Sequence, residues 1–295
     1  MKFMTAVGMI DPSFYVPIAR AAEAAGFDSV NVPDSICYPK ESDSTYPYTP
    51  DGNCEFLANK PFIEPIVAMA AMGASTERVQ FHTSVLKLPI RHPVIFAKEI
   101  TSLCALLDNR VSLGVGTSPW PDDYEIVGLS WERRGKRFEE CIEIIRGLET
   151  GEFFEYHGEF YDVPAIKMNP VPSRPIPILI GGHADANVRR AARFGDGWIA
   201  AGMAPEQLVV VIKQLGELRK QHGRDHLPFE IHATTMDSFS PDGVARLEEM
   251  GVTHTMGGGY GRFNPYGLEQ DPESLQEKLD NLNRYAEDVI AKVNA

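Results

Sequence analysis

The sequence predicts a (β/α)8 barrel, and three observations lead to that fold class. Eight short runs rich in Val, Ile, Thr and aromatic residues recur along the 295 residues, and each is followed by a segment with helical spacing. The runs are almost continuously apolar, as parallel strands covered by helices are. Eight such units, with no antiparallel tail and no obvious linker, favour a closed barrel over an open doubly wound sheet. We therefore expect one domain over residues 1–295.

The expected strands share β-branched and aromatic residues bounded by turn-forming residues. They are Phe3–Val7, Ser29–Val32, Val79–Val85, Val111–Val115, Ile176–Ile180, Gly197–Ala201, Phe229–Thr235 and Val252–Met256. The expected helices cover residues 11–26, 61–76, 92–107, 134–149, 184–194, 205–222, 241–250 and 272–292. The first shows the pattern well, because Pro12 stands in its first turn and Gly26 at its end.

Two connecting segments are longer than ordinary loops. Ser35–Lys60 follows the second strand, and Gly151–Pro175 lies between the fourth helix and the fifth strand. Long loops in compact barrels are usually functional. The first belongs to the carboxyl-terminal face of the barrel, where active sites of this fold are built. The second either forms a subdomain, reaches that face or is a surface excursion that aids dimer contacts.

Charge and cysteine content narrow the class of protein. The formal net charge is −13 and the isoelectric point is near 5.1, which argues against a nucleic-acid or anionic-membrane partner. The longest apolar run, Ile66–Ala74, is far shorter than the roughly 20 residues of a membrane span. The start lacks the pattern of a signal peptide, and the four cysteines form no CxxC pair. We expect a cytosolic protein with reduced thiols.

Several chemistries lack their usual residues. His82, His183, His232 and His254 fall on four different βα units without an HxH pair, so we expect scattered histidines and no metal centre. No GxSxG elbow marks a nucleophilic serine. Lys87 is expected to be solvated rather than to act as a nucleophile, and the same holds for Lys167.

Glycine is abundant at the expected strand ends. Gly114-Val115-Gly116 fails as a dinucleotide fingerprint but allows a flat ligand to approach the backbone. Gly181-Gly182-His183 directly precedes a helix, so it predicts either an anion site at the helix N-terminus or simply a tight turn. Gly257–Gly259 is a second possible anion loop. Glycine-rich ends with few strong acids or bases suit a cofactor that carries its own reactivity.

Four ordered segments together resemble a known family. They are AAEAAGFDSVNVPDS, TSVLKLPIRHPVIFAKEITSLCALLDNRVSLGVGTSPW, RRGKRFEECIEIIRGLETGEFFEYHGEFYDV and NPVPSRPIPILIGGHADANVRRAARFGDGWIAA. The chain resembles the bacterial luciferase-like monooxygenase superfamily, and within it the oxidoreductases that depend on the deazaflavin coenzyme F420. The resemblance covers about residues 1–202, and the last third matches by element order alone.

The resemblance implies a (β/α)8 barrel, usually homodimeric, that holds a flavin or deazaflavin ring at its carboxyl-terminal face. It implies a non-prolyl cis peptide behind the ring at Ser84-Val85, and an acid near the ring at Asp34. The residues expected to contact the cofactor are Asp34, Ser84, Val85, Gly116, Thr117, Ser118, Gly181, Gly182 and Ala184.

Three departures from the sugar-phosphate-oxidising relatives bear on the chemistry. A His proton donor of those relatives is Ser35 here, their partner Glu is Pro119, and a phosphate-holding hydroxyl is Ala201. Oxidation of glucose 6-phosphate is therefore not expected. The candidate catalytic acids are Asp34, Tyr124 and His82, and the candidate substrate pocket comprises Ser35, Trp120 and Phe81.

Three functions fit these residues. The first is a hydride transfer between coenzyme F420 and a small, partly apolar organic substrate that enters under the Ser35–Lys60 loop. The second is an FMN-dependent monooxygenase that uses dioxygen, since ordinary flavins react with dioxygen and deazaflavins react with it poorly. The third is a cofactor-binding protein without turnover. The resemblance favours the first.

Overall fold

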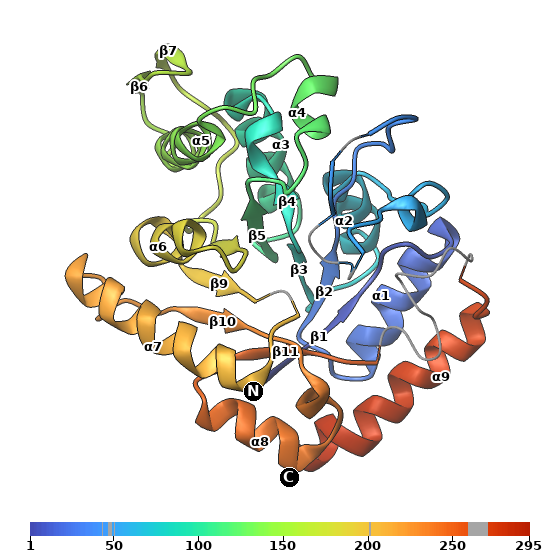
Figure 1. Cartoon of the computed structure of the whole chain (residues 1–295). Helices are drawn as coiled ribbons and strands as arrows, with labels where there is room; N and C mark the ends of the chain where they lie inside the picture. The colour runs from blue at the N-terminus through green and yellow to red at the C-terminus, as the bar shows by residue number, and fades with distance from the viewer. Residues whose placement is uncertain (43, 47–48, 50, 201, 259–270) are drawn as a thin grey trace.

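The parallel sheet of the chain closes into a barrel (Figure 1). The structure, a computed structural model, describes residues 1–295 except 43, 47–48, 50, 201 and 259–270. Its strands run in the order β3-β2-β1-β11-β10-β9-β8-β5-β4, and a further pairing of β3 with β5 closes the ring. The strands are β1 (Lys2–Ala6), β2 (Ser29–Val32), β3 (Gln80–Thr83), β4 (Leu86–Lys87), β5 (Val111–Gly116), β8 (Ile178–Gly181), β9 (Gly197–Ile199), β10 (Glu230–His232) and β11 (His254–Met256). All eight expected strands are present, and the predicted (β/α)8 fold is confirmed.

The third expected strand is broken into two pieces. β3 pairs with both β2 and β5, whereas β4 continues on the other side of the break and pairs with β5 alone. Between them the peptide bond of Ser84-Val85 is cis, as the resemblance implies. The break therefore lies at the carboxyl end of β3, on the face of the barrel where active sites collect.

Helices surround the barrel and largely match the expected segments. They are α1 (Tyr15–Ala24), α2 (Pro65–Gly73), α3 (Pro93–Leu106), α4 (Asp122–Ile126), α5 (Arg134–Leu148), α6 (Asp185–Phe194), α7 (Pro205–Gln221), α8 (Pro241–Glu249) and α9 (Leu275–Tyr285). Short 3-10 turns occur at Pro12–Phe14, Glu55–Leu57, Leu88–Ile90 and Met236–Phe239. None of these described helices has the length and apolar character that a membrane span needs.

Two helix predictions need correction. The second helix begins at Pro65 rather than at Pro61, because the Glu64 carboxylate caps it by accepting the backbone N–H of Val67 at 3.1 Å. The short helix α4 was not expected. Its five residues are too few to show helical periodicity in the sequence.

The last helix closes the ring of helices. Ser274 caps α9, and Glu277 completes a capping box with it. The helix continues through a π-helical turn, Ala286–Ile290, into α10 (Ala291–Val293). Figure 1 shows α9 beside α1, so the two ends of the chain meet in the outer layer.

The second long segment forms a hairpin on the outside of α5. β6 (Phe154–His157) and β7 (Asp162–Ile166) pair antiparallel, and the tip between them reaches back along α5. The buried carboxylate of Glu140 on α5 accepts the backbone N–H groups of Glu159 and Phe160, each at 2.9 Å. This contact ties the insertion to the barrel wall.

We predict that Glu140→Ala lowers the free energy of unfolding by about 2–3 kcal/mol, because two hydrogen bonds to a buried, charged acceptor are lost. Urea-induced unfolding measures the effect. Glu217→Ala, on the exposed face of α7 beside Lys220, is the matched control and should change stability by less than about 0.5 kcal/mol. Equal stability of the two variants would contradict a tethering role for Glu140.

Candidate active site

Val85 lies between the ends of two strands at the mouth of the barrel. A Cβ atom on Gly181 of β8 would come within 2.6 Å of Val85 Cγ1, and one on Gly116 of β5 within 3.0 Å of Cγ2. A Cβ atom at Gly181 would therefore displace the valine side chain, whereas one at Gly116 would need only a small shift of it. Ser84 and Val85 are both half-buried, so the broken strand presents a small apolar surface to the mouth.

Asp34 holds the segment that follows the break. Its side chain is 1% exposed and accepts two hydrogen bonds from the Arg91 guanidinium, at 2.8 and 2.9 Å. It also accepts the backbone N–H of Lys87 at 2.8 Å. Because both oxygens of this carboxylate are engaged in a bidentate pair, the geometry suits a residue that positions β4 rather than one that exchanges protons.

An ion pair missed by the sequence reasoning lies at the tip of β5. Lys87 Nζ is 2.8 Å from the carboxylate of Asp123, and the two side chains are 11% and 2% exposed. The same carboxylate accepts the hydroxyl of Ser118, whose backbone φ is +63°. The expectation of a solvated Lys87 is therefore wrong, whereas Lys167 is exposed as expected. Lys87 and Asp123 are far apart in the sequence, which is why the pair left no local signal.

Aromatic side chains cover this ion pair. Lys87 Nζ lies 5.5 Å from the ring centre of Trp120, which is buried and meets Tyr46 of the long loop edge-to-face at 5.6 Å. Tyr124 is also buried, and its hydroxyl donates to the carbonyl of Thr117 at 2.6 Å. Burial raises the pKa of Tyr124 above its usual value, so this phenol stays protonated and holds the β5 tip in place.

Two expected site residues lie elsewhere. Phe81 is fully buried in the hydrophobic core, with the guanidinium of Arg110 5.7 Å from its ring centre, so it does not line the mouth. His82 is buried next to His232, with ring centres 5.1 Å apart. Successive strand residues point to opposite faces, and the one-residue step between Phe81 and His82 separates them. Ser35 is half-buried directly after Asp34, near the mouth as expected.

The loop before α6 offers backbone donors. Ala184 is the N-cap of α6 and gives it no side-chain cap, so the first N–H groups of the helix lack an intrahelical partner. Gly182 has a φ of +109°, and its carbonyl accepts the Trp198 indole N–H at 3.0 Å. A cavity of about 420 Å³ lies beside this loop and is lined by His183, Met203, Glu206, Gln207, Val210 and Val211.

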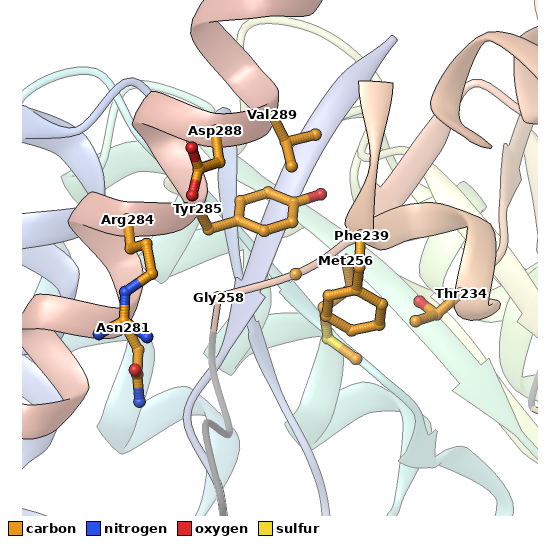
Figure 2. A pocket seen from close by; sticks show the side chains of 10 residues that line it. Thr234, Phe239, Met256, Gly258, Asn281, Arg284, Tyr285, Asp288 and Val289 are labelled. Atoms are coloured by element: carbon orange, nitrogen blue, oxygen red, sulfur yellow. The ribbon is translucent and has the colours of Figure 1, made fainter. Parts of the chain in front are cut away.

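A second cavity, of about 380 Å³, lies between α9 and the ends of β10 and β11 (Figure 2). Asn281 and Arg284 line one side of it, opposite Phe239. The Gly257 N–H already donates to the Met4 carbonyl at 3.0 Å, which removes it from the anion loop considered above. Gly259 lies outside the described residues.

The histidines are not scattered, contrary to expectation. His82, His232 and His254 meet inside the barrel, and the rings of His232 and His254 stack with centres 4.1 Å apart. Glu230 joins them through a 2.8 Å contact from Oε2 to His232 Nε2. His183 stands apart, exposed on the loop before α6.

Burial and mutual proximity set the charge of this cluster. Burial, and then the neighbouring His232, lowers the pKa of His254 to about 4. Burial, followed by the other two imidazoles, holds the pKa of His82 well below its usual range. Burial would raise the pKa of Glu230, but the His232 hydrogen bond and the nearby imidazoles lower it overall. At neutral pH the Glu230 carboxylate therefore lies beside the neutral ring of His254, while the neutral ring of His82 packs on His232.

Fold and mouth together define a (β/α)8 barrel whose carboxyl-terminal end is lined by glycine backbone, a small apolar surface and buried ion pairs. The sequence model of the luciferase-like monooxygenase family matches residues 4–287. The chain belongs to this family.

Three similar proteins place the chain within it. An uncharacterized protein of Mycobacterium tuberculosis is 56% identical over 293 residues, which cover 99% of this chain and 100% of the relative. An F420-dependent glucose-6-phosphate dehydrogenase of Gordonia bronchialis is 31% identical over 259 residues, 84% of this chain and 71% of the relative. The coenzyme F420 dependent tetrahydromethanopterin reductase of Methanopyrus kandleri shares the fold, with a TM-score of 0.75, 14% identity and 99% of each chain covered.

We predict that Asp123→Asn lowers the free energy of unfolding by about 3 kcal/mol, because it leaves the buried ammonium of Lys87 without its counter-charge. Urea-induced unfolding is the measurement. Asp122→Asn, one residue earlier and less buried, is the matched control and should cost less than about 1 kcal/mol. If the Asp123 variant is as stable as the control, the pair does not order the β5 tip.

Proposed function

We propose that the chain is an oxidoreductase that transfers a hydride between coenzyme F420 and a small, partly apolar organic substrate. The observation that carries the proposal is the 31% identity over 84% of the chain to an enzyme named for its dependence on F420. We also retain the homodimer implied by the resemblance as a prediction.

The residues at the mouth fit a flat ring with a charged tail. Missing Cβ atoms at Gly116 and Gly181 let Val85 form an apolar floor against which a planar heterocycle can lie. The uncapped N–H groups of α6, after Gly182 and Ala184, are suited to a phosphate on the tail. F420 and FMN both have a flat ring and a phosphate on the tail, so these features of the mouth suit either cofactor.

When bound, F420 supplies a ring carbon that accepts or donates a hydride. The protein supplies position: Asp34 fixes β4 and hence Val85, while Asp123 fixes Ser118 and Lys87, which would help to hold the cofactor at the mouth. Trp120 and Tyr46 keep water away from that side of the mouth. Orientation of two reactants in this way lowers the activation free energy, by up to about 7–11 kcal/mol where the alignment is complete.

The substrate we propose is not a sugar phosphate. Ser35 and Pro119 stand where the resemblance places a His donor and a Glu partner in sugar-phosphate-oxidising relatives. The third departure, Ala201, lies outside the described residues. Buried aromatic rings beside the mouth favour an apolar carbonyl, imine or conjugated alkene instead.

A second candidate function is an FMN-dependent monooxygenase. The family is described as luciferase-like monooxygenases, and the glycines and the apolar surface at the mouth suit an ordinary flavin ring as well. The two functions differ in how the reduced ring reacts with dioxygen, so the identity of the cofactor decides between them.

The first test is a cofactor titration of the purified chain, followed through its tryptophan emission. Because Trp120 lies at the proposed site and Trp198 contacts the Gly182 carbonyl, we expect F420 to quench the emission saturably and FMN to act only at much higher concentration. Reduced F420 should then be oxidised by at least one member of a panel of enones, imines and quinones, measured at 420 nm. Tight binding of FMN without a response to F420 would select the monooxygenase instead.

The second test probes the contact between Gly181 and Val85. Gly181→Ala places a Cβ atom 2.6 Å from Val85 Cγ1, so the valine must move into the mouth. Overpacking of this kind costs about 1–3 kcal/mol, and we expect cofactor affinity to fall about 10- to 100-fold. Gly216→Ala, at an α7 position with open space, is the matched control.

The double variant Gly181→Ala with Val85→Ala tests whether the loss of cofactor affinity is transmitted through the Val85 side chain. If Val85 transmits the effect, truncating it restores affinity relative to Gly181→Ala alone. Loss of affinity that persists unchanged in the double variant would instead place the cofactor directly against Gly181.

A further inference from the structure

The opposite end of the barrel carries a group of metal-ligating side chains that the proposed function does not use. Glu230 and His254 begin β10 and β11, and His232, which closes the three-residue strand β10, pairs with His254. Glu230 Oε2 is 2.8 Å from His232 Nε2 and 3.8 Å from His254 Nε2. Each residue offers one ligand atom, and these atoms lie within 4.8 Å of one another. Two bonds of about 2.0–2.1 Å from one metal ion span at most about 4.2 Å, which covers the two separations from Glu230 and leaves a small movement of the side chains to close the group around an ion.

The Thr253 hydroxyl orients the ring of His254. This hydroxyl donates to the Ile231 carbonyl at 3.1 Å and accepts the Ile231 N–H at 2.8 Å. Its remaining contact, 2.8 Å to His254 Nδ1, is then a bond in which the imidazole donates. We assign the proton of His254 to Nδ1 from this network, which leaves a lone pair on Nε2. A histidine ligand typically donates its other ring N–H to an oxygen in this way.

In this tautomer two hydrogen-bond acceptors face each other. The Nε2 lone pair of His254 faces the Glu230 carboxylate at 3.8 Å without a proton between them. A divalent cation placed between the three ligand atoms would turn that repulsion into coordination. Lys2, whose charge acts on His254, does not supply this positive charge to Glu230, because its Nζ is paired with Asp28 at 2.6 Å.

Solvent can reach the group from the amino-terminal end of the barrel. The side chains of Glu230 and His254 are 39% and 18% exposed, whereas His232 is 3% exposed. A metal ion can therefore enter from solvent and keep a water ligand on the exposed side. His82 packs edge-to-face on His232 and limits the movement of its ring.

We propose that Glu230, His232 and His254 bind one divalent transition-metal ion at the amino-terminal end of the barrel. Two imidazoles and one carboxylate suit Zn²⁺ and its neighbours in the first transition row better than Mg²⁺ or Ca²⁺, which prefer oxygen ligands. Binding requires an unprotonated Nε2 on His232, so the hydrogen bond between Glu230 and that nitrogen gives way to coordination. The ion joins β10 to β11, whose register contains only the pair of His232 with His254.

The experiment uses the full chain, stripped of metal with EDTA and dialysed. Calorimetric titration with Zn²⁺ should give one ion per chain, and Co²⁺ should give visible absorption bands of a low-symmetry site. Loss of a partner of a metal ligand already costs about 10- to 100-fold in affinity, so Glu230→Gln and His254→Gln should each cost at least about 100-fold. Zn²⁺ should raise the melting temperature of the natural chain and leave that of either variant unchanged.

The matched control is His157→Gln. His157 is an exposed histidine between two carboxylates, Glu155 at 2.7 Å and Asp162, on the β6-β7 hairpin. The control should bind Zn²⁺ as the natural chain does. Absence of Zn²⁺ binding to the natural chain, or unchanged binding by a folded Glu230→Gln variant, would overturn the proposal. So would loss of binding in the His157 variant, which would place the ion on the hairpin.

Discussion

The close approach of the third strand to two glycine-bearing neighbours is the constraint on which the mouth of the barrel depends. Thr83 ends β3 so close to β5 that a Cβ atom on Gly114 would lie 1.9 Å from its carbonyl oxygen. The Thr83 hydroxyl donates to the Gly114 carbonyl at 2.6 Å and fixes that approach. From there the chain turns so that Val85 lies against Gly116 and Gly181. A side chain at Gly114 would displace the end of β3, and one at Gly116 or Gly181 would displace the Val85 side chain.

Two buried ion pairs hold the chain on either side of this point. Asp34 reaches across from β2 to Arg91, and Lys87 on β4 reaches Asp123 beyond β5. Buried pairs add little to stability relative to apolar packing, but an unpaired partner costs about 3–5 kcal/mol. Their effect is therefore to make any other path for residues 84–91 costly. Both pairs serve the geometry of the mouth more than the stability of the barrel.

Much of the fold was readable from the sequence, because buried strands and capped helices leave local patterns. The Ser84-Val85 break and the glycines near it followed from the resemblance. The Lys87–Asp123 pair could not be predicted from the sequence. Its two residues are distant in the chain and come together only because β4 pairs with β5, the strand that precedes Asp123. The histidine group had a signal that was missed. Glu230 and His232 are two apart on a predicted strand, hence on one face, and His254 begins the next strand.

The carboxyl-terminal end of the barrel carries the proposed active site, whereas the amino-terminal end serves stability. The strands that carry the histidines show why. β9, β10 and β11 have three residues each, whereas β2 and β3 share a register of four pairs. Short strands have few ladder hydrogen bonds, so the seam between β10 and β11 relies on side chains such as Thr253. Residues at the amino-terminal face of such barrels generally serve stability. A cation held there would hold β10 and β11 together. At their carboxyl ends the same two strands lead to Thr234 and Gly257, which line the cavity of Figure 2.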